Sequence, residues 1–125
     1  VVYEFETTVQ AQTDNASSTP LAITNPGNVT SPCRVEITPR VGAASITLTG
    51  ICRDSFTGED LPVIIKNLTT GNVVVIDALT GLITEAGNLK DIDIWALPSL
   101  LPGANAISCS SSSMTVKVIV TPLYD

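Results

Sequence analysis

Apolar and polar residues alternate along most of the chain with the period of β-strands. The pattern is clearest in residues 33–38 (CRVEIT), 45–53 (SITLTGICR) and 114–120 (MTVKVIV). Shorter stretches of the same kind are residues 2–9, 21–24, 91–95 and 105–109. Because the side chains of a strand point alternately to its two faces, each segment is predicted to be a strand with one buried face.

Two further segments contain continuous apolar runs, which are typical of strands covered on both faces. They are residues 61–67 (LPVIIKN) and 72–78 (NVVVIDA), and the short connection LTTG joins them. A connection of this length with a terminal glycine predicts that the two strands form a β-hairpin.

About ten short strands separated by turn residues indicate an all-β fold, either an antiparallel β-sandwich or a jelly roll. At most one turn of helix is expected, around residues 97–101. A length of 125 residues suits one domain with one core, so residues 1–125 are predicted to form a single domain. Since the sequence begins at Val1 and not at methionine, we expect a domain of a larger protein or a processed product.

The charge balance excludes several classes of partner. Twelve acidic residues outnumber six basic ones, for a formal net charge of −6. The basic residues stand singly along the chain: Arg34, Arg40, Arg53, Lys66, Lys90 and Lys117. Nucleic acids and anionic membrane surfaces both require clustered basic residues, so neither is an expected partner. Membrane insertion is not expected either, because no apolar stretch is long enough to span a bilayer.

The residue inventory argues against catalysis. The sequence has no histidine, so Ser-His-Asp and Cys-His arrangements cannot form. Asp91 and Asp93 share one face of a predicted strand, and paired carboxylates are what glycosidases use. Exposed strand carboxylates are more often a solvated face, so we predict no catalytic residues and no cofactor.

Metal binding has one candidate, the acidic loop at residues 53–60 (RDSFTGED). Clustered carboxylates are what Ca²⁺ prefers, but the spacing of an EF-hand is absent. We favour an acidic turn in which Arg53 neutralises Asp54, and we predict no metal site. The three cysteines, Cys33, Cys52 and Cys109, follow the apolar phase of their strands. They are expected to be buried free thiols, with one disulfide and a leftover thiol as the alternative.

One polar face suggests carbohydrate binding. In residues 91–95 (DIDIW), Trp95 is in phase with Asp91 and Asp93. An aromatic ring beside carboxylates on a sheet surface suits stacking against a sugar, so these three residues are the candidate glycan-binding face. The favoured alternative is that Trp95 folds under the loop that follows it, because an indole is usually well buried.

Three motifs occur in a fixed order: NPGNVTSP at 25–32, VID at 75–77 and LPSLLPGANAI at 97–107. With these motifs the sequence resembles the C-terminal domain of the distal tail proteins of siphophages and related prophages. The resemblance extends from about Asn25 to Tyr124. The resemblance implies a galectin-like or carbohydrate-binding-module-like sandwich with a structural or adhesion-hub role at the tail tip. It also implies other tail-tip proteins as partners and a place in the virion tail, assembled in the bacterial cytoplasm.

The family's ring-forming N-terminal domain has no counterpart in this sequence, so oligomerisation is expected only together with such a domain. Two alternative functions stay open. One is a glycan-binding module that recognises a host surface saccharide, and the other is an Ig-like domain of a bacterial surface protein.

The third motif also has a structural interpretation. Leu97, Leu100 and Leu101 are predicted to close one end of the sandwich as an apolar plug. Pro102 and Gly103 then form a type II turn, which needs a positive φ at the glycine. The turn delivers Asn105 in register into the next strand.

Overall fold

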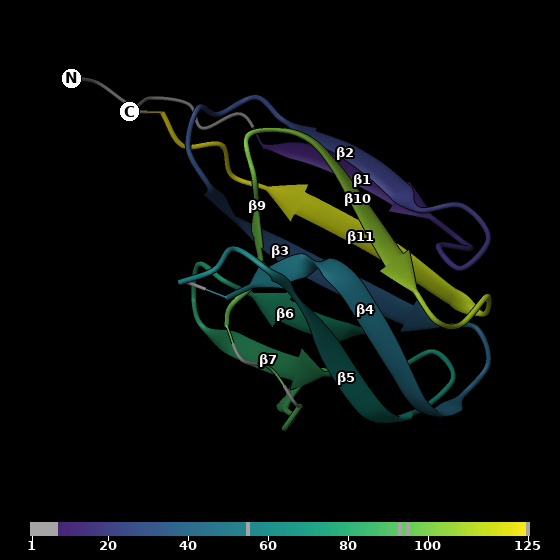
Figure 1. The fold of residues 1–125 in the computed structure, drawn as a ribbon. Helices are drawn as coiled ribbons and strands as arrows, with labels where there is room; N and C mark the ends of the chain where they lie inside the picture. The colour runs from purple at the N-terminus through teal and green to yellow at the C-terminus, as the bar shows by residue number, and fades with distance from the viewer. Residues whose placement is uncertain (1–7, 55, 93, 95, 125) are drawn as a thin grey trace.

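The structure is a computed structural model that describes residues 8–54, 56–92, 94 and 96–124. It is an antiparallel β-sandwich of two sheets (Figure 1), which confirms the predicted fold class. The larger sheet has the order β1 (Val9–Thr13), β11 (Met114–Val120), β3 (Ser31–Pro39), β6 (Val74–Asp77), β7 (Leu82–Glu85) and β8 (Asn88–Leu89), and β9 (Ser99–Leu100) pairs with the start of β3. The smaller sheet has the order β2 (Leu21–Asn25), β10 (Gly103–Cys109), β4 (Ala43–Arg53) and β5 (Asp60–Leu68).

The core consists of the inward-facing side chains of both sheets, as the alternation predicted. On β11, Met114, Val116, Val118 and Val120 are all fully buried, and the residues between them are half-buried. Burial of these aliphatic side chains is the main favourable contribution to folding. Among the residues that the structure describes, there is no helix long and apolar enough to cross a membrane.

The predicted hairpin between residues 61–67 and 72–78 is wrong. β5 pairs with β4 in the smaller sheet, whereas β6 pairs with β3 and β7 in the larger one. The connection between β5 and β6 therefore crosses from one sheet to the other, and the N–H of Gly71 donates to the carbonyl of Pro39 at 2.9 Å. The expectation that both faces of these strands are covered is also not met, because each strand has one fully buried face. A single buried face is compatible with either connection.

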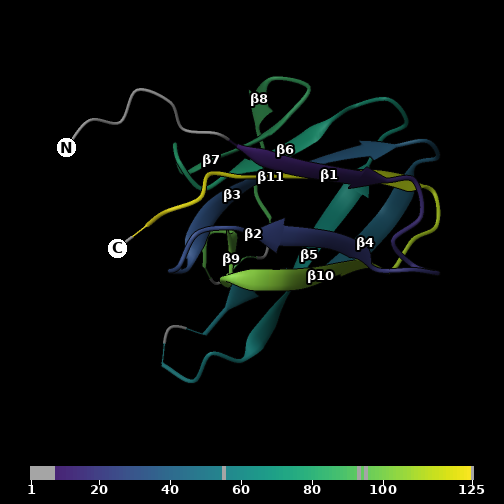
Figure 2. The ribbon, with the colours of Figure 1, turned by 90° about the horizontal axis from the view of Figure 1, so that it is seen from above.

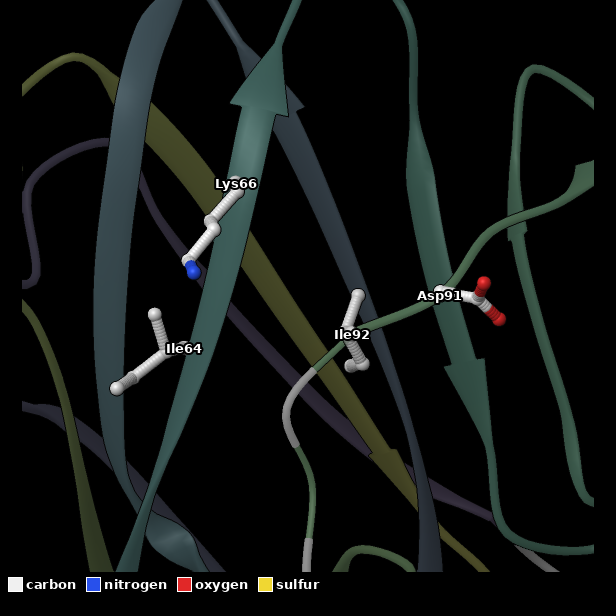
Figure 3. A pocket seen from close by; sticks show the side chains of 4 residues that line it. All are labelled: Ile64, Lys66, Asp91 and Ile92. Carbon is white, nitrogen blue, oxygen red and sulfur yellow. The ribbon is translucent and has the colours of Figure 1, made fainter.

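The predicted strand at residues 91–95 is also wrong for its described residues. Asp91, Ile92 and Ile94 are not in a strand, although both isoleucines pack against the core. Asp91 and Ile92 line a hollow together with Ile64 and Lys66 of β5 (Figure 3), and the isoleucines cover part of the core without strand pairing. The predicted strand at residues 2–9 falls mostly outside the described residues, and β1 begins at Val9.

A bulge interrupts β4 near its end. The register with β5 shifts between Leu48 and Cys52, so the consecutive residues Ile51 and Cys52 are both buried. Gly50 makes this possible with a φ of 94°, and a Cβ at this position would collide with the carbonyl oxygen of Ala106. Only glycine fits this combination of dihedral angle and close approach.

Candidate functional site

The first and third motifs of the sequence meet at one end of the sandwich. Ser31 pairs with Leu100, and Asn25 pairs with Gly103. We call this the β9 end, formed by residues 25–31, 54, 56–59, 78–81, 97–103 and 121–124 (Figures 1 and 2). The second motif, VID, ends at the same place, where β6 turns into β7.

Asn25 fastens the first loop to the third. Its side chain is buried, and its Oδ1 accepts the N–H of Gly27 at 2.9 Å. Its Nδ2 donates to the carbonyls of Val29 at 3.3 Å and of Leu100 at 3.2 Å. A buried amide is costly unless it is hydrogen-bonded, and here all three bonds go to backbone groups of the two loops.

Asn105 holds the Pro-Gly turn. Its Oδ1 accepts the N–H of Leu101 at 3.1 Å, and its Nδ2 donates to the carbonyls of Leu101 at 2.8 Å and Gly103 at 3.0 Å. Gly103 has a φ of 90°, which the turn requires and which its open surroundings permit. Strand β10 begins at Gly103, so Asn105 is its third residue.

Arg53 connects the bulge to this turn. Its guanidinium donates to the carbonyl of Ser99 at 2.8 Å, to the carbonyl of Gly50 at 3.1 Å and to Oδ1 of Asn105 at 3.5 Å. The expectation that Arg53 neutralises Asp54 is therefore not met, because the guanidinium faces backbone carbonyls of the sandwich. Arg53 and Asn25 were not predicted as members of this end.

The three leucines of the third motif differ in burial. Leu100 is 0% exposed, whereas Leu97 and Leu101 are each 44% exposed. The expected burial of all three is therefore wrong for two of them. The reason is the alternation of β9, which points Leu100 inward and leaves its neighbour Leu101 outside. A plug at this end can consist only of Leu100, together with the buried Pro98.

Three aspartates at or beside this end accept backbone N–H groups. Oδ1 of Asp54 accepts the N–H of Phe56 at 2.7 Å and of Thr57 at 3.1 Å. Oδ1 of Asp77 accepts the N–H of Leu79 at 2.9 Å, and Oδ1 of Asp60 accepts that of Gly50 at 3.0 Å. The described residues contain no group of three or more acidic or cysteine side chains arranged to hold a metal ion.

All three cysteines are buried free thiols. Burial raises the pKa of Cys33 to about 12, and the neighbouring Cys52 adds to the rise. Burial also raises the pKa of Cys52 to about 11 and raises the pKa of Cys109. Since the thiolate is the reactive form, burial disfavours the reaction of these thiols in the folded protein.

The candidate glycan-binding face is described only at Asp91, because Asp93 and Trp95 lie outside the described residues. Beside Asp91 is a shallow hollow of about 100 Å³, lined by Ile64, Lys66, Asp91 and Ile92 (Figure 3). The carboxylate of Asp91 points away from Lys66 (Figure 3). Ligand pockets usually measure roughly 300 Å³ or more, so this hollow is too small to enclose a sugar.

No protein-family model matches the sequence, and no curated protein matches it. Among solved structures, the fold is similar to that of the SPP1 Dit protein, whose structure is presented as a paradigm of the hub adsorption apparatus in phages infecting Gram-positive bacteria. The TM-score is 0.65 at 10% sequence identity, over 91% of this chain. The match covers 46% of the SPP1 protein, so this chain spans about half of its length. At this identity the similarity establishes a shared fold.

Proposed function

We propose that this chain is a non-enzymatic structural and interaction module of a phage or prophage tail tip, equivalent to the C-terminal domain of a distal tail protein. The observation that carries the proposal is the similarity of the whole sandwich to SPP1 Dit, a hub protein of a phage adsorption apparatus. Coverage of 46% of that protein is consistent with one domain of a larger tail protein. The partners would then be other tail-tip proteins, and the location would be the virion tail.

The geometry of the β9 end is consistent with the structural role in this proposal. The three motifs that suggested the family lie together there, and Asn25, Asp77 and Asn105 direct their side chains to backbone groups of the connecting loops. These residues therefore have a structural explanation, which agrees with a scaffold. Within the described part of the chain, no polar side chain of this end is arranged as a nucleophile with a base.

Purified particles of the phage or prophage that encodes this chain provide the test. Mass spectrometry should detect the protein in the tail fraction, and gold-labelled antibodies should place it at the tail tip. Deletion of the gene should abolish intact tails, because a hub protein is needed for assembly. A protein that is abundant in the producing cells but absent from the particles would contradict the proposal.

The absence of catalysis is tested on the purified domain. It should hydrolyse no glycoside, ester or peptide substrate. Hydrolysis that disappears in Asp91→Asn or Asp93→Asn would instead assign an enzyme that uses paired carboxylates.

A further inference from the structure

Exposed apolar side chains are concentrated at the β9 end. The described residues include nine strongly exposed large apolar side chains, and six of them lie at this end: Phe56, Leu79, Leu97, Leu101, Leu123 and Tyr124. At the opposite end, the corresponding loops contribute only Val41 to the nine. Of the two ends of the sandwich, the β9 end is therefore the richer in exposed apolar side chains among the described residues.

Phe56 is the most exposed of these side chains. It lies in the connection between β4 and β5, which projects beyond the body of the sandwich at the β9 end (Figure 2). Its exposed fraction is 96%, although the whole chain has only two phenylalanines. We call the described residues of this connection, Asp54 and Phe56–Glu59, the β4–β5 tip.

The described residues of the β4–β5 tip are joined by hydrogen bonds to one another. Besides the two bonds to Oδ1 of Asp54, the N–H of Gly58 donates to the carbonyl of Asp54 at 2.9 Å. The N–H of Asp54 in turn donates to the carbonyl of Glu59 at 2.8 Å. The base of the tip is fixed by Arg53 and by the bulge at Gly50. Exposed aromatic side chains are typical binding anchors, and the backbone on both sides of Ser55 is held by these bonds.

The charge around Phe56 defines the chemistry of the partner. Asp54, Glu59 and Asp60 place three carboxylates within a few residues of the ring, whereas the charge of Arg53 faces the sandwich. A complementary surface is therefore basic. A second copy of this chain does not fit, because each copy has a net charge of −6 and no cluster of basic residues.

We propose that the β4–β5 tip inserts Phe56 into an apolar pocket, rimmed by lysine or arginine, on a different protein. Phe56 supplies the buried anchor, and Glu59 faces the basic rim. Asp54 and Asp60 also add charge, but their Oδ1 atoms support the loop and the bulge, so Glu59 is the residue whose charge can be changed without disturbing the tip.

Photo-cross-linking from position 56 tests this inference. The full-length protein, with p-benzoylphenylalanine in place of Phe56, is produced in the cells that normally make it and is irradiated there. We expect a cross-link to another protein, mapped by mass spectrometry to apolar residues beside lysine or arginine. No cross-link, a cross-link only to a second copy, or a contact without basic residues would overturn the proposal.

Affinity measurements with the purified cross-linked partner complete the test. Phe56→Ala should weaken binding at least tenfold, and Phe56→Leu should weaken it less. Glu59→Gln should weaken binding by a few-fold and reduce its dependence on salt. Leu89→Ala is the matched control, because Leu89 is 79% exposed but lies on β8, and it should leave the affinity unchanged. Equal affinities for Phe56→Ala and Leu89→Ala would refute the anchor.

All variants should keep the unfolding temperature of the wild type, since the substituted side chains are exposed. The inference does not depend on the proposed function. If the chain is a tail protein, the partner is expected to be a tail protein too. Cross-linking in cells reports the contact whether or not particles contain the protein, so the two proposals can fail separately.

Discussion

Replacement of Asn105 by alanine is the sharpest test of how the β9 end is held. The side chain makes three hydrogen bonds to the backbone of Leu101 and Gly103, and the residue is only 8% exposed. Each such bond contributes about 1 kcal/mol net, for an upper value of about 3 kcal/mol. Since Leu101 and Gly103 are exposed, water can reach part of the freed backbone, and we expect a loss of about 2 kcal/mol.

The loss is measured as the change in the free energy of unfolding, by urea titration followed with circular dichroism. In a domain of this size, 2 kcal/mol also lowers the melting temperature by roughly 6–10 °C. Asn88→Ala is the matched control, because Asn88 is exposed on β8 and no hydrogen bond of its side chain is described. A loss for Asn105→Ala below about 0.5 kcal/mol, or no larger than that of the control, would refute the reasoning.

Three other predictions follow from the same structure, and a fourth, at Trp95, follows from the sequence alone. Leu100→Ala should cost about 2–4 kcal/mol as a buried leucine, whereas Leu101→Ala should cost less than about 1 kcal/mol, and equal losses in urea titrations would contradict this. Gly50→Ala should cost at least about 2 kcal/mol, because its φ is 94° and the Cβ meets the carbonyl of Ala106; a wild-type melting temperature would disprove it. The three cysteines should resist iodoacetamide at pH 8 until the protein unfolds, and a mass deficit of about 2 Da without reductant would reveal a disulfide instead. Trp95→Ala should lower the melting temperature and leave a glycan array unchanged, whereas loss of a reproducible sugar signal at unchanged stability would favour carbohydrate binding.

Alkaline conditions give a further readout of the same thiols. Because burial raises their pKa values in the folded protein, the unfolded chain releases these protons first. Their contribution to stability is fully present below about pH 9 and is lost as the pH rises toward 11–12. Replacement of Cys33 by alanine should reduce this alkaline loss.

The sequence predicted which residues form strands better than it predicted which strands pair with one another. β3 and β11 were predicted correctly because one face of each is buried, and a buried face produces the alternation of apolar and polar residues. The same period does not identify the neighbouring strand, so residues 61–78 were wrongly joined into a hairpin. The alternation of residues 91–95 came from isoleucines that cover a side of the sandwich without pairing, which a period of two cannot distinguish from a strand.

Two polar residues of the β9 end can be recognised in the sequence by their position in an apolar pattern. Asn25 follows Leu21 and Ile23 in the apolar phase of β2, and Asn105 precedes Ile107 in the apolar phase of β10. A polar residue at an inward position must find hydrogen-bond partners, so this phase marks a structural amide. The partners themselves, and the role of Arg53, depend on loops that meet only in three dimensions.

The placement of β11 between β1 and β3 has a consequence for biosynthesis. Val9 pairs with Val120, so β1 has no partner in its sheet until almost the entire sandwich has been synthesised. Ribosomes add about 5–20 residues per second, and β-proteins with distant pairings fold in milliseconds to seconds once their strands are available. Completion of the larger sheet must therefore wait for β11 to leave the ribosome, although β3, β6, β7 and β8 can pair earlier. Until then, β1 and β3 expose unpaired strand edges, which makes nascent chains truncated before Met114 prone to aggregation.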